Sequence, residues 1–365
     1  MNLRPLYVQS NQCASLLSGV ILDSSDQTYL SGMTSPGRPI ANFLFLGPTG
    51  SGKTRIMEAT AECLLHNPRA VTKIDCAEFQ HTHEIAKLIG SPPGYLGHQE
   101  TKAALSQETI DQHHTDTVKI SILLFDEIEK ASNALWNLLL GILDKATLAL
   151  GDNRKVDFSQ TMIFMTSNLG ATEINAVLRP RLGFAPSGRE CHEFGETEED
   201  LSHKMSSAGL EAVRRRLTPE FVNRLDKIVV FKPLGRNELR ILDIELQVVQ
   251  KWILQTAMSR PFVFSVTEAG KEYLLQEGTN VNHGARHLKR AVDRLIVHPV
   301  SNLIATDQIL SGDAIQIDHQ PGCPSMNFSL EGEGLPLPEM TKLSSYCVAE
   351  PAAAPAAIAA EIHRA

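Results

Sequence analysis

Residues 47–54 read Gly47-Pro48-Thr49-Gly50-Ser51-Gly52-Lys53-Thr54. This is a complete G-x-x-x-x-G-K-T phosphate-binding loop, whose glycines let backbone N–H groups turn toward phosphate oxygens without a clashing Cβ atom. The apolar run Phe43–Leu46 stands directly before the loop, and the segment after it has the apolar period of a helix. A strand, the loop and a helix N-terminus in this order form the setting that the motif needs, which disfavours a chance match in a Gly-rich turn.

The loop predicts a site for the phosphates of ATP, formed by all eight residues from Gly47 to Thr54. Lys53 can reach the β- and γ-phosphates as a point charge. The Thr54 hydroxyl is placed to ligate Mg²⁺. ATP and Mg²⁺ are therefore the ligands that we expect.

The composition is that of an ordinary globular protein, with 42% hydrophobic and 21% charged residues. A chain of 365 residues is long enough for about two domains. The formal net charge of -8 argues against general affinity for nucleic acid or for an anionic membrane, because neutralising phosphates requires a basic surface.

The cysteines and the apolar runs bear on where the protein works. The six cysteines are scattered without a C-x-x-C pair, which is typical of reduced intracellular thiols and not of a disulfide framework or a zinc site. No uncharged apolar run approaches the ~20 residues of a membrane span. The N-terminus lacks the basic-then-apolar pattern of a signal peptide. We therefore expect a cytoplasmic protein without a membrane partner.

Apolar, strand-like runs alternate with helical patterns from residue 42 to about residue 231. The runs are Phe43–Leu46, Ala70–Ile74, Ile120–Phe125, Thr161–Thr166 and Lys227–Phe231. Short, nearly all-apolar strands between helices indicate a parallel sheet that is covered on both faces. We predict an α/β fold with a parallel five-stranded sheet and helices on both faces.

Changes in composition divide the chain into four segments. Residues 1–40 are a polar, turn-rich lead-in, and residues 41–232 form the large domain with the sheet. After the break at Pro233-Leu234-Gly235, residues 233–320 are predicted to form a smaller, mainly helical domain. Residues 321–365 are rich in Pro, Ser, Glu and Ala and bury too little apolar area to offset chain entropy, so we expect a disordered tail.

The apolar run Ile122–Phe125 is followed by two adjacent carboxylates, Asp126 and Glu127. A buried strand would deliver Asp126 to the carboxyl edge of the sheet, where it can hold Mg²⁺ through water. Glu127 can then polarise the attacking water as a general base. The alternative is a strand that ends in a solvated acidic turn, and the phosphate-binding loop upstream weakens it.

The apolar run Thr161–Thr166 is followed by Ser167 and Asn168. The amide of Asn168 has the chemistry to orient the lytic water or to contact the γ-phosphate. Taken by itself, an asparagine at such a place is most often a turn former.

These segments together resemble the AAA+ superfamily, and within it the second, C-terminal ATPase module of the Clp-type protein unfoldases and disaggregases, such as the ClpA, ClpB and ClpC proteins. The motifs that carry the likeness, in order, are Phe45–Gly50, Asp126–Ala131, Met165–Gly170, Pro219–Asp226 and Gly284–Arg286. The likeness covers roughly residues 38–318. It implies a P-loop AAA+ module followed by a small C-terminal lid domain, in a homo-oligomeric ring of the hexameric kind.

The resemblance also implies roles for two arginines. Arg224 matches the arginine finger, which acts on the γ-phosphate held by the neighbouring subunit. Arg286 matches the second sensor, which reaches the nucleotide from the small domain of the same subunit. Planar, always-charged guanidinium groups suit both tasks. The alternatives are a surface arginine near a salt bridge to Asp226 and, for Arg286, a charge at a helix end.

The stretch Gly94-Tyr95-Leu96-Gly97 points to the substrate. Glycines on both sides of an aromatic–aliphatic pair make a mobile loop, and an aromatic ring packs on backbone and apolar side chains alike. In the resembled family this loop lines the central pore and pulls an extended polypeptide. The alternative is a turn in which Tyr95 packs on its own domain.

A second, weaker signal is Leu182-Gly183-Phe184. Family members that partner with a barrel-shaped peptidase carry a similar tripeptide, which docks into pockets on that peptidase. Exposed Leu182 and Phe184 would be suitable apolar anchors for this. A helix C-cap, with Gly183 in the left-handed conformation and Phe184 packed back, explains the pattern equally well.

Several features have no assigned role. The adenine-side pattern of the family appears here only as Val8–Asn11, so phosphate binding is better supported than adenine recognition. We assign no mechanism to the insertion 105–119 or to the acidic stretch 193–200. Five histidines cluster near Gly94–Gly97 and in the segment that follows. They lack the spacing of metal ligands and are expected to be solvated: His81, His83, His98, His113 and His114.

The sequence thus predicts an ATPase of the AAA+ ring type that unfolds, remodels or disaggregates polypeptides by threading them through a central pore. Feeding of a peptidase is a further hypothesis. Two rival functions stay open. One is a nucleic-acid remodelling AAA+ ATPase, and the negative net charge of the chain and the aromatic loop with Tyr95 argue against it. The other is a nucleotide-switched binding scaffold that hydrolyses ATP poorly.

Overall fold

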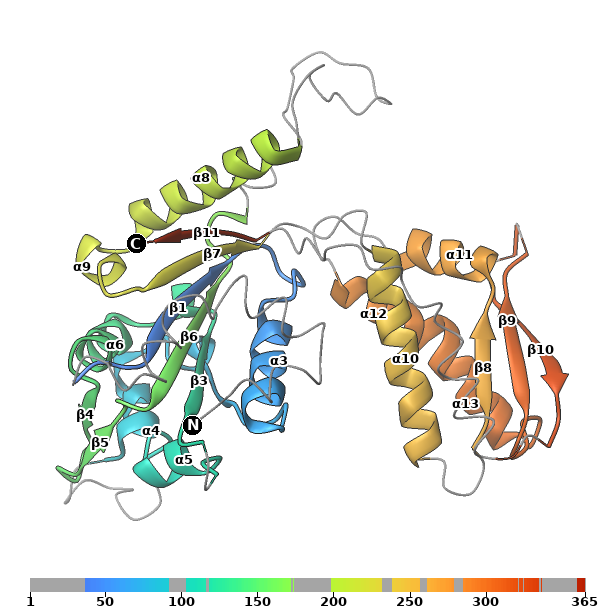
Figure 1. Ribbon diagram of the computed structural model, residues 1–365, viewed down its shortest axis with the longest axis horizontal. Helices are drawn as coiled ribbons and strands as arrows, with labels where there is room; N and C mark the ends of the chain where they lie inside the picture. Colours follow the sequence, from blue (N-terminus) through green and yellow to red (C-terminus); the bar gives the residue numbers. More distant parts are fainter. Residues whose placement is uncertain are drawn as a thin grey trace. The chain divides into compact units, whose positions relative to one another are not determined.

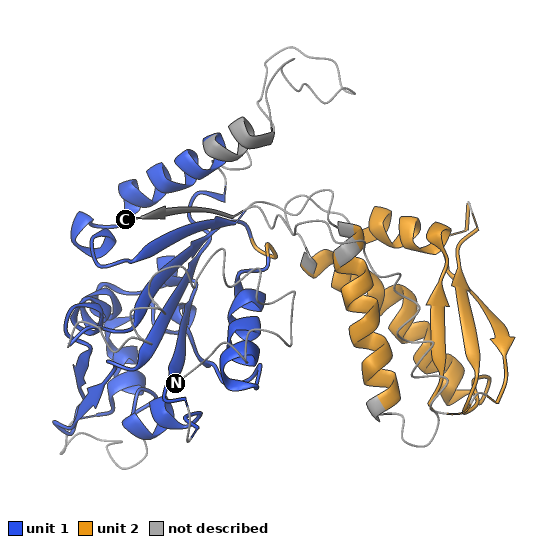
Figure 2. Cartoon of the chain, viewed as in Figure 1, with its two compact units in different colours: residues 1–48, 52–232, 356–365 blue, residues 49–51, 233–355 orange. Residues whose placement is uncertain are grey.

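The computed structural model describes residues 37–91, 103–115, 118–171, 173, 198–231, 238–256, 261–278, 285–320, 322–323, 325–334, 336 and 360–364. The chain divides into two compact units, which Figure 2 shows in different colours. Unit 1 comprises residues 1–48, 52–232 and 356–365, and unit 2 comprises residues 49–51 and 233–355. Each unit has its own sheet and its own buried hydrophobic residues.

Unit 1 is built on one sheet that contains five parallel strands (Figure 1). In spatial order they are β7 (Lys227–Phe231), β1 (Ala41–Leu46), β6 (Thr161–Ser167), β3 (Ser121–Asp126) and β2 (Thr72–Asp75). The predicted parallel five-stranded sheet is therefore confirmed. A sixth strand, β11 (Ala360–Arg364), pairs antiparallel with β7 at the edge of the sheet and was not predicted.

The central strands are buried on both faces. Every residue of β1, β6 and β7 is buried, which is why their sequences are nearly all apolar. Because successive side chains of a strand point to opposite faces, each strand contributes to two separate cores. Leu44 and Met165 belong to one core, and Phe43 and Phe164 belong to the other.

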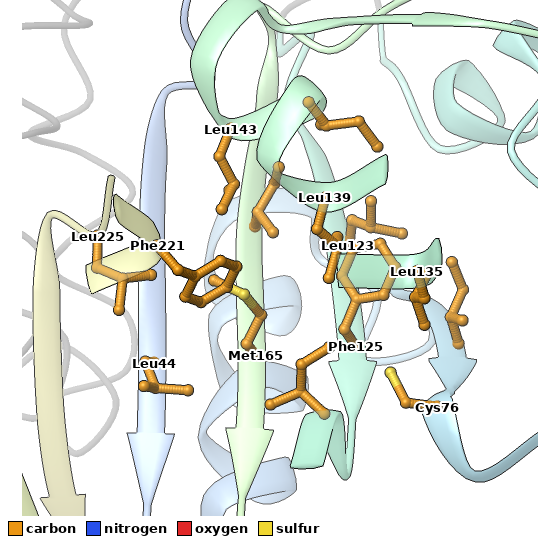
Figure 3. Close-up of a cluster of buried hydrophobic side chains, with 14 of the residues drawn as sticks. Leu44, Cys76, Leu123, Phe125, Leu135, Leu139, Leu143, Met165, Phe221 and Leu225 are labelled. Carbon is orange, nitrogen blue, oxygen red and sulfur yellow. The ribbon is translucent and has the colours of Figure 1, made fainter. Parts of the chain in front are cut away.

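Helices cover both faces of the sheet, as predicted (Figure 1). The helix α3 (Lys53–Leu65) packs Met57 and Ala61 on the face that holds Phe43. The opposite core receives side chains from α6 (Asn133–Lys145), α8 (Glu198–Arg216) and α9 (Pro219–Val222). Figure 3 shows Leu135, Leu139 and Leu143 of α6 packed above strand residues of that core.

Short elements complete unit 1 around the strand ends. They are the 3₁₀ turns η1 (Cys76–Glu78), η2 (Thr82–Ile85) and η3 (Ile128–Lys130), the helices α4 (Ala86–Ile89) and α5 (Gln107–Asp111), and the hairpin of β4 (Thr147–Ala149) with β5 (Lys155–Asp157). The helix α5 lies in the 105–119 insertion, and Ile110 and Leu105 bury themselves in the main core there.

Unit 2 is mainly helical, as predicted. Its helices are α10 (Glu238–Thr256), α11 (Glu268–Gly278), α12 (Ala285–Val292), the π-helical turn η4 (Asp293–Val297) and α13 (His298–Ala305). They pack with a three-stranded sheet of β8 (Val263–Val266), β9 (Ala314–Asp318) and β10 (Asn327–Gly332). The buried amide of Gln250 ties α10 to β8, because it donates to the Phe262 carbonyl and accepts from the Phe264 N–H.

The expectation of a disordered tail over residues 321–365 is wrong for β11 and for β10. The strand β11 pairs antiparallel with β7, and β10 pairs antiparallel with β9. Met326 is buried and Phe328 packs against the unit 2 core, so a short alternation of apolar residues binds the chain to the sheet edge. The overall composition of the tail concealed this alternation.

Phe164 is the residue on which we test the packing of the sheet. It is fully buried, and its ring centroid lies 5.1 Å from that of Phe43 and 5.6 Å from that of Phe45. Phe164→Ala should lower the free energy of unfolding of unit 1 by about 3–5 kcal/mol, because it removes the apolar contacts and leaves a cavity.

Urea denaturation of the full chain measures this loss. A Trp252→Phe background leaves Trp136, which packs edge-on against Phe221 in the unit 1 core, as the fluorescent reporter. Leu330→Ala is the matched control, since Leu330 is 52% exposed. A loss below about 1 kcal/mol for Phe164→Ala would contradict the packing described here.

Candidate functional site

The phosphate-binding loop connects the carboxyl end of β1 with the first turn of α3. Gly47, Gly50 and Gly52 all have positive φ angles, of 141°, 79° and 93°. Gly47 also needs its missing side chain, because a Cβ atom there would lie 2.5 Å from the Phe231 carbonyl oxygen. The sequence therefore folds into this loop because glycine occupies each of these positions.

The loop presents groups that suit a phosphate. Among the described residues, no side chain forms a capping hydrogen bond at the N-terminus of α3, where N–H groups suit an anion. The Ser51 hydroxyl is buried and has no hydrogen-bond partner among the described residues. The donor set and the glycine backbone together fit the phosphates of a nucleotide.

Lys53 lies at the centre of the site. Its Nζ atom donates to the carbonyl oxygens of Gly47 at 2.6 Å and Pro48 at 3.0 Å, and to Asn168 Oδ1 at 3.1 Å. The side chain is thus buried between the loop and the end of β6. The predicted residues Lys53 and Asn168, far apart in the sequence, are brought together by the sheet.

Asp126 ends β3 and is bonded from two sides. Lys73 of β2 lies 2.7 Å from its Oδ2 atom, and the Thr166 hydroxyl of β6 donates to its Oδ1 atom. Burial would raise the pKa of Asp126, but the hydrogen bonds from Lys73 and Thr166 and the charge of Lys53 outweigh it and lower the pKa. The carboxylate is therefore ionised at neutral pH, as a metal ligand must be.

Glu127 follows in the left-handed conformation, with φ 57°. Its backbone N–H donates to the Thr166 hydroxyl at 3.1 Å, and its carboxylate pairs with Lys130 at 2.5 Å. The hydrogen bond and the charge of Glu127 raise the pKa of Lys130. The Glu127 side chain is about one-third exposed, so water can reach it.

Three residues of this site were not predicted to have a role: Lys73, Thr166 and Glu129. Glu129 Oε1 accepts the backbone N–H of Asn168 at 3.2 Å. Thr166 connects β6 to both Asp126 and Glu127. Their positions depend on which strands are neighbours in the sheet, and the sequence order of the strands does not reveal that.

Arg224 lies at the opposite end of the parallel strands, where their amino ends meet. The Asn42 side chain donates to the Arg224 carbonyl oxygen at 3.1 Å, which places Arg224 beside the amino end of β1. Five residues of extended strand, about 16 Å, separate Asn42 from Gly47. Arg224 therefore does not reach the phosphate-binding loop of its own chain.

The side chain of Arg224 pairs with Glu220 at 3.1 Å and lies 3.5 Å from Asp144 of α6. A salt bridge to Asp226 was the alternative for this arginine, and the structure shows different partners. Asp226 instead accepts the Asn42 backbone N–H at 2.7 Å, and its own N–H donates to the Asn42 carbonyl. Asp226 is thus occupied in joining β7 to β1.

The predicted substrate loop, Gly94-Tyr95-Leu96-Gly97, lies outside the described residues, but the chain on both sides of it is described. On the near side, the Gly151 N–H of the β4–β5 hairpin bonds the Ile89 carbonyl at 2.8 Å. On the far side, the Ala104 and Leu105 N–H groups bond carbonyls of α4 at 3.1 Å. Both ends of the loop are therefore anchored on the same short helix.

The remaining sequence predictions are not brought into the site by the described structure. Arg286 is the second residue of α12 in unit 2 and is exposed, and its role stays a prediction. Residues 8–11 and 182–184 lie outside the described residues.

Among the described residues, no group of three or more His, Cys, Asp or Glu side chains is arranged to hold a metal ion. Within the same residues, no helix has the length and apolar character to cross a membrane.

The fold and the site define a class of protein: a P-loop nucleotide-binding module in which the loop follows β1, an acidic pair stands at the end of β3, and a polar amide follows β6, the strand between them. Two families match the chain. "AAA domain (Cdc48 subfamily)" matches residues 38–228, and "C-terminal, D2-small domain, of ClpB protein" matches residues 234–317.

Similar proteins agree with this result. The chain is 35% identical over 289 residues to the ATP-dependent Clp protease ATP-binding subunit ClpC of Staphylococcus saprophyticus, covering 79% of this chain and 33% of that protein. It is 35% identical over 302 residues to the chaperone protein ClpB of Rhizobium meliloti, covering 82% and 31%. A cryo-EM reconstruction of Hsp104 in its closed state, with ATPγS and FITC casein, is similar with a TM-score of 0.67 and 26% identity, covering 89% of this chain and 53% of that chain.

The chain therefore belongs to the AAA+ ATPases of the Clp type, and it corresponds to their second ATPase module with its small domain. This membership confirms the predicted family and implies nucleotide binding. The chain spans about a third of the length of the curated relatives that it matches.

Asp226 provides a pH-dependent test of the β1–β7 junction. Burial raises the pKa of Asp226 more than the Asn42 hydrogen bond and the charge of Arg38 lower it. A carboxyl group whose pKa is higher in the folded chain costs stability once pH rises through that pKa. Asp226→Asn keeps an acceptor for the Asn42 N–H and should therefore be more stable than the wild type at pH 7. This gain should shrink as pH falls toward 4.

Urea denaturation at pH 7, 6, 5 and 4, followed by Trp136 fluorescence, measures the difference. Asp152→Asn is the control with the opposite sign, because Arg154 lowers the pKa of Asp152. An Asp226→Asn variant that is less stable than the wild type at pH 7 would show that the ionised carboxylate is favoured at this junction.

Proposed function

We propose that copies of this chain assemble into a ring, of the hexameric kind, that hydrolyses ATP and threads polypeptides through a central pore to unfold, remodel or disaggregate them. Each ATP site is shared between two neighbouring copies. One copy supplies the phosphate-binding loop with Asp126, Glu127 and Asn168, and the next copy supplies Arg224.

The observation that carries this proposal is the position of Arg224 at the sheet edge opposite the phosphate-binding loop. An arginine that cannot reach its own site can act on phosphate only in another copy of the chain. Its pair with Glu220 does not prevent this, because the Glu220 side chain is 65% exposed and exposed pairs are weak. A guanidinium group in trans makes hydrolysis depend on assembly.

The residues of the loop would hold the nucleotide. The backbone N–H groups of Gly47, Thr49, Gly50, Ser51 and Gly52 cradle the phosphates, and Pro48, which has no N–H, forms part of the loop. Lys53 exchanges its hydrogen bonds to neutral carbonyls for bonds to phosphate oxygens, which are stronger because the donor and the acceptor then carry opposite charges. Thr54 and Asp126 would hold Mg²⁺, which neutralises charge on the phosphates when it is bound.

Hydrolysis needs a water that is deprotonated and oriented. Glu127 is the general base in this proposal, and its partly exposed carboxylate lies one residue beyond Asp126. Asn168 orients the water or the γ-phosphate from the end of β6, next to Lys53. Arg286 senses the nucleotide from the small domain of the same copy.

The substrate would be gripped by Tyr95 between Gly94 and Gly97. The described residues on both sides of this loop are anchored on α4 and form its base. Ile89 and Leu105 connect that base to the core of unit 1, in which the sheet that carries the ATP site is also packed. This arrangement supports a loop that responds to the state of the site.

Two parts of the proposal, peptidase docking and an unfolded protein as substrate, gain support from similar proteins. The ClpC relative is named as a subunit of a protease, which supports the hypothesis that Leu182, Gly183 and Phe184 dock on a peptidase. A cytoplasmic location also stays a prediction. The similar Hsp104 reconstruction was obtained with FITC casein, which supports unfolded protein as a substrate.

Mixing two inactive variants tests whether the site is shared. Lys53→Ala removes the lysine of the loop, and Arg224→Ala should lower the rate of ATP hydrolysis by about 10³-fold. Coexpressed in equal amounts, the two variants should regain activity. In about one pocket in four, an intact loop then meets an intact arginine from its neighbour.

The ATPase rate of the mixture, with sizing to show that rings form, decides the outcome. Each variant alone is the control for the mixture. If Arg224→Ala hydrolyses ATP at the wild-type rate, or if the mixed rings stay as inactive as either variant, the arginine does not act between copies.

Tyr95→Ala tests the grip on substrate. The variant should lose the stimulation of ATP hydrolysis by an unfolded protein such as casein, because the aromatic contact surface is gone. Tyr95→Phe keeps the ring and should keep the stimulation. ATP hydrolysis without casein is measured for all three proteins to show that their sites are assembled.

The same assay separates the proposal from its rivals. Stimulation of Tyr95→Ala by casein to the wild-type level would exclude this loop as the grip. Stimulation of the wild type by DNA, and not by casein, would favour a nucleic-acid remodelling ATPase. A wild type that binds ATP but hydrolyses it poorly, both with casein and with DNA, would favour a nucleotide-switched scaffold.

A further inference from the structure

The acidic turn after β3 carries a carboxylate, Glu129, to which the chemistry described above assigns no task. It lies in η3, and Ile128 beside it is fully buried in the unit 1 core. The turn is closed by the Lys130 N–H on the Glu127 carbonyl at 3.0 Å and the Ala131 N–H on the Ile128 carbonyl at 3.1 Å. Glu129 is therefore held at a fixed place on the sheet edge.

The Glu129 carboxylate is directed at the end of β6. Its Oε1 atom accepts the Asn168 backbone N–H at 3.2 Å. Its Oε2 atom is buried and has no hydrogen-bond partner among the described residues. The Asn168 side chain in turn accepts from Lys53 Nζ at 3.1 Å. Glu129 is thus connected to the phosphate-binding lysine through one residue, Asn168.

The Asn168 backbone needs such an anchor. Asn168 follows the last residue of β6, Ser167, so the strand ladder no longer holds it. Its carbonyl accepts the Ala171 N–H at 3.2 Å in a turn. Without Glu129 the N–H of Asn168 loses its acceptor, and the turn can rotate and carry the amide away from Lys53. A displacement of about 1 Å in a positioning group costs about 100-fold in rate.

We propose that Glu129 is a positioning residue for ATP hydrolysis, which fixes the Asn168 side chain beside Lys53 by accepting the Asn168 backbone N–H. This inference rests on the proposed ATPase activity of the chain. Glu129 acts through Asn168 and not on the nucleotide itself. Its loss therefore affects the rate of hydrolysis, while the loop that binds the phosphates is left intact.

Steady-state ATP hydrolysis and ATP affinity of the full chain test this inference. Glu129→Ala should lower kcat by about ten- to 100-fold, with the Kd for ATP within about threefold of the wild type. Glu129→Gln keeps an oxygen that can accept the N–H and should retain kcat within about fivefold. Glu78→Ala, which removes an exposed carboxylate from the adjacent turn η1, is the matched control and should keep the wild-type kcat.

A double-mutant cycle shows whether Glu129 acts through Asn168. If it does, Glu129→Ala should lower kcat by less than about threefold in an Asn168→Ala background, because the side chain to be positioned is already absent. A purely structural role would give the same loss in both backgrounds. Thermal denaturation of each variant reports its folding. If Glu129→Ala does not fold, Glu129→Leu, which keeps most of the side-chain volume but has no acceptor, takes its place.

Four results would overturn the inference. They are an unchanged kcat in Glu129→Ala, an equal loss in both backgrounds, a folded Glu129→Gln that is as slow as Glu129→Ala, and a loss of ATP affinity as large as the loss of kcat. A wild-type chain that does not hydrolyse ATP under any of the conditions above would overturn the proposed function itself. The two failures are therefore distinguishable.

Discussion

The site depends on one constraint: β1, β3 and β6 are parallel neighbours, so their carboxyl ends meet at one edge of the sheet. The register pairs Leu46 with Ser167 and Phe125 with Met165, which brings Lys53 to Asn168 and Asp126 to Thr166. These strands are apolar on both faces, so a register slip would not expose a polar face and the usual hydrophobic penalty is small. Specific contacts must set the register instead. The Thr166 hydrogen bonds at the edge and the stacked rings of Phe43 and Phe164 within the core provide them.

The same sheet separates the two charges that a phosphoryl-transfer site requires. The strands carry Lys53 at the carboxyl edge, and the turn before β7 carries Arg224 at the amino edge. The Asp226–Asn42 junction holds that turn against β1. A rigid sheet cannot bring both edges to one phosphate. In the proposed function, Arg224 of a second copy therefore completes the site, and hydrolysis depends on assembly.

The local sequence pattern was sufficient to predict the five parallel strands of unit 1, the phosphate-binding loop, and the polar residues that follow β3 and β6. Each of these depends on a few neighbouring residues, such as the glycines of the loop or the apolar run before Asp126. The partners of those residues were not predictable. Lys73 meets Asp126 because β2 lies beside β3, and Glu129 meets Asn168 because β3 lies beside β6. Strand order is a property of the whole sheet. The strand β10 was missed for a different reason, because three alternating apolar residues are lost in the composition of a long polar tail.

The charges at the carboxyl edge are arranged so that each acidic group has a specific partner. Asp126 has Lys73, Glu127 has Lys130, and Glu129 has the Asn168 N–H. The described hydrogen bonds of Lys53 go to neutral carbonyl and amide oxygens. A phosphate that displaces those oxygens forms hydrogen bonds in which both partners are charged, and these are stronger than bonds from Lys53 to neutral oxygens. Asn168, which follows the end of β6, accepts a hydrogen bond from Lys53. A phosphate that takes over this bond would change the contact between the loop and β6. The end of β6 is also where Thr166 and Glu129 attach the acidic turn, which gives the bound phosphate a direct physical connection to the residues that would activate water.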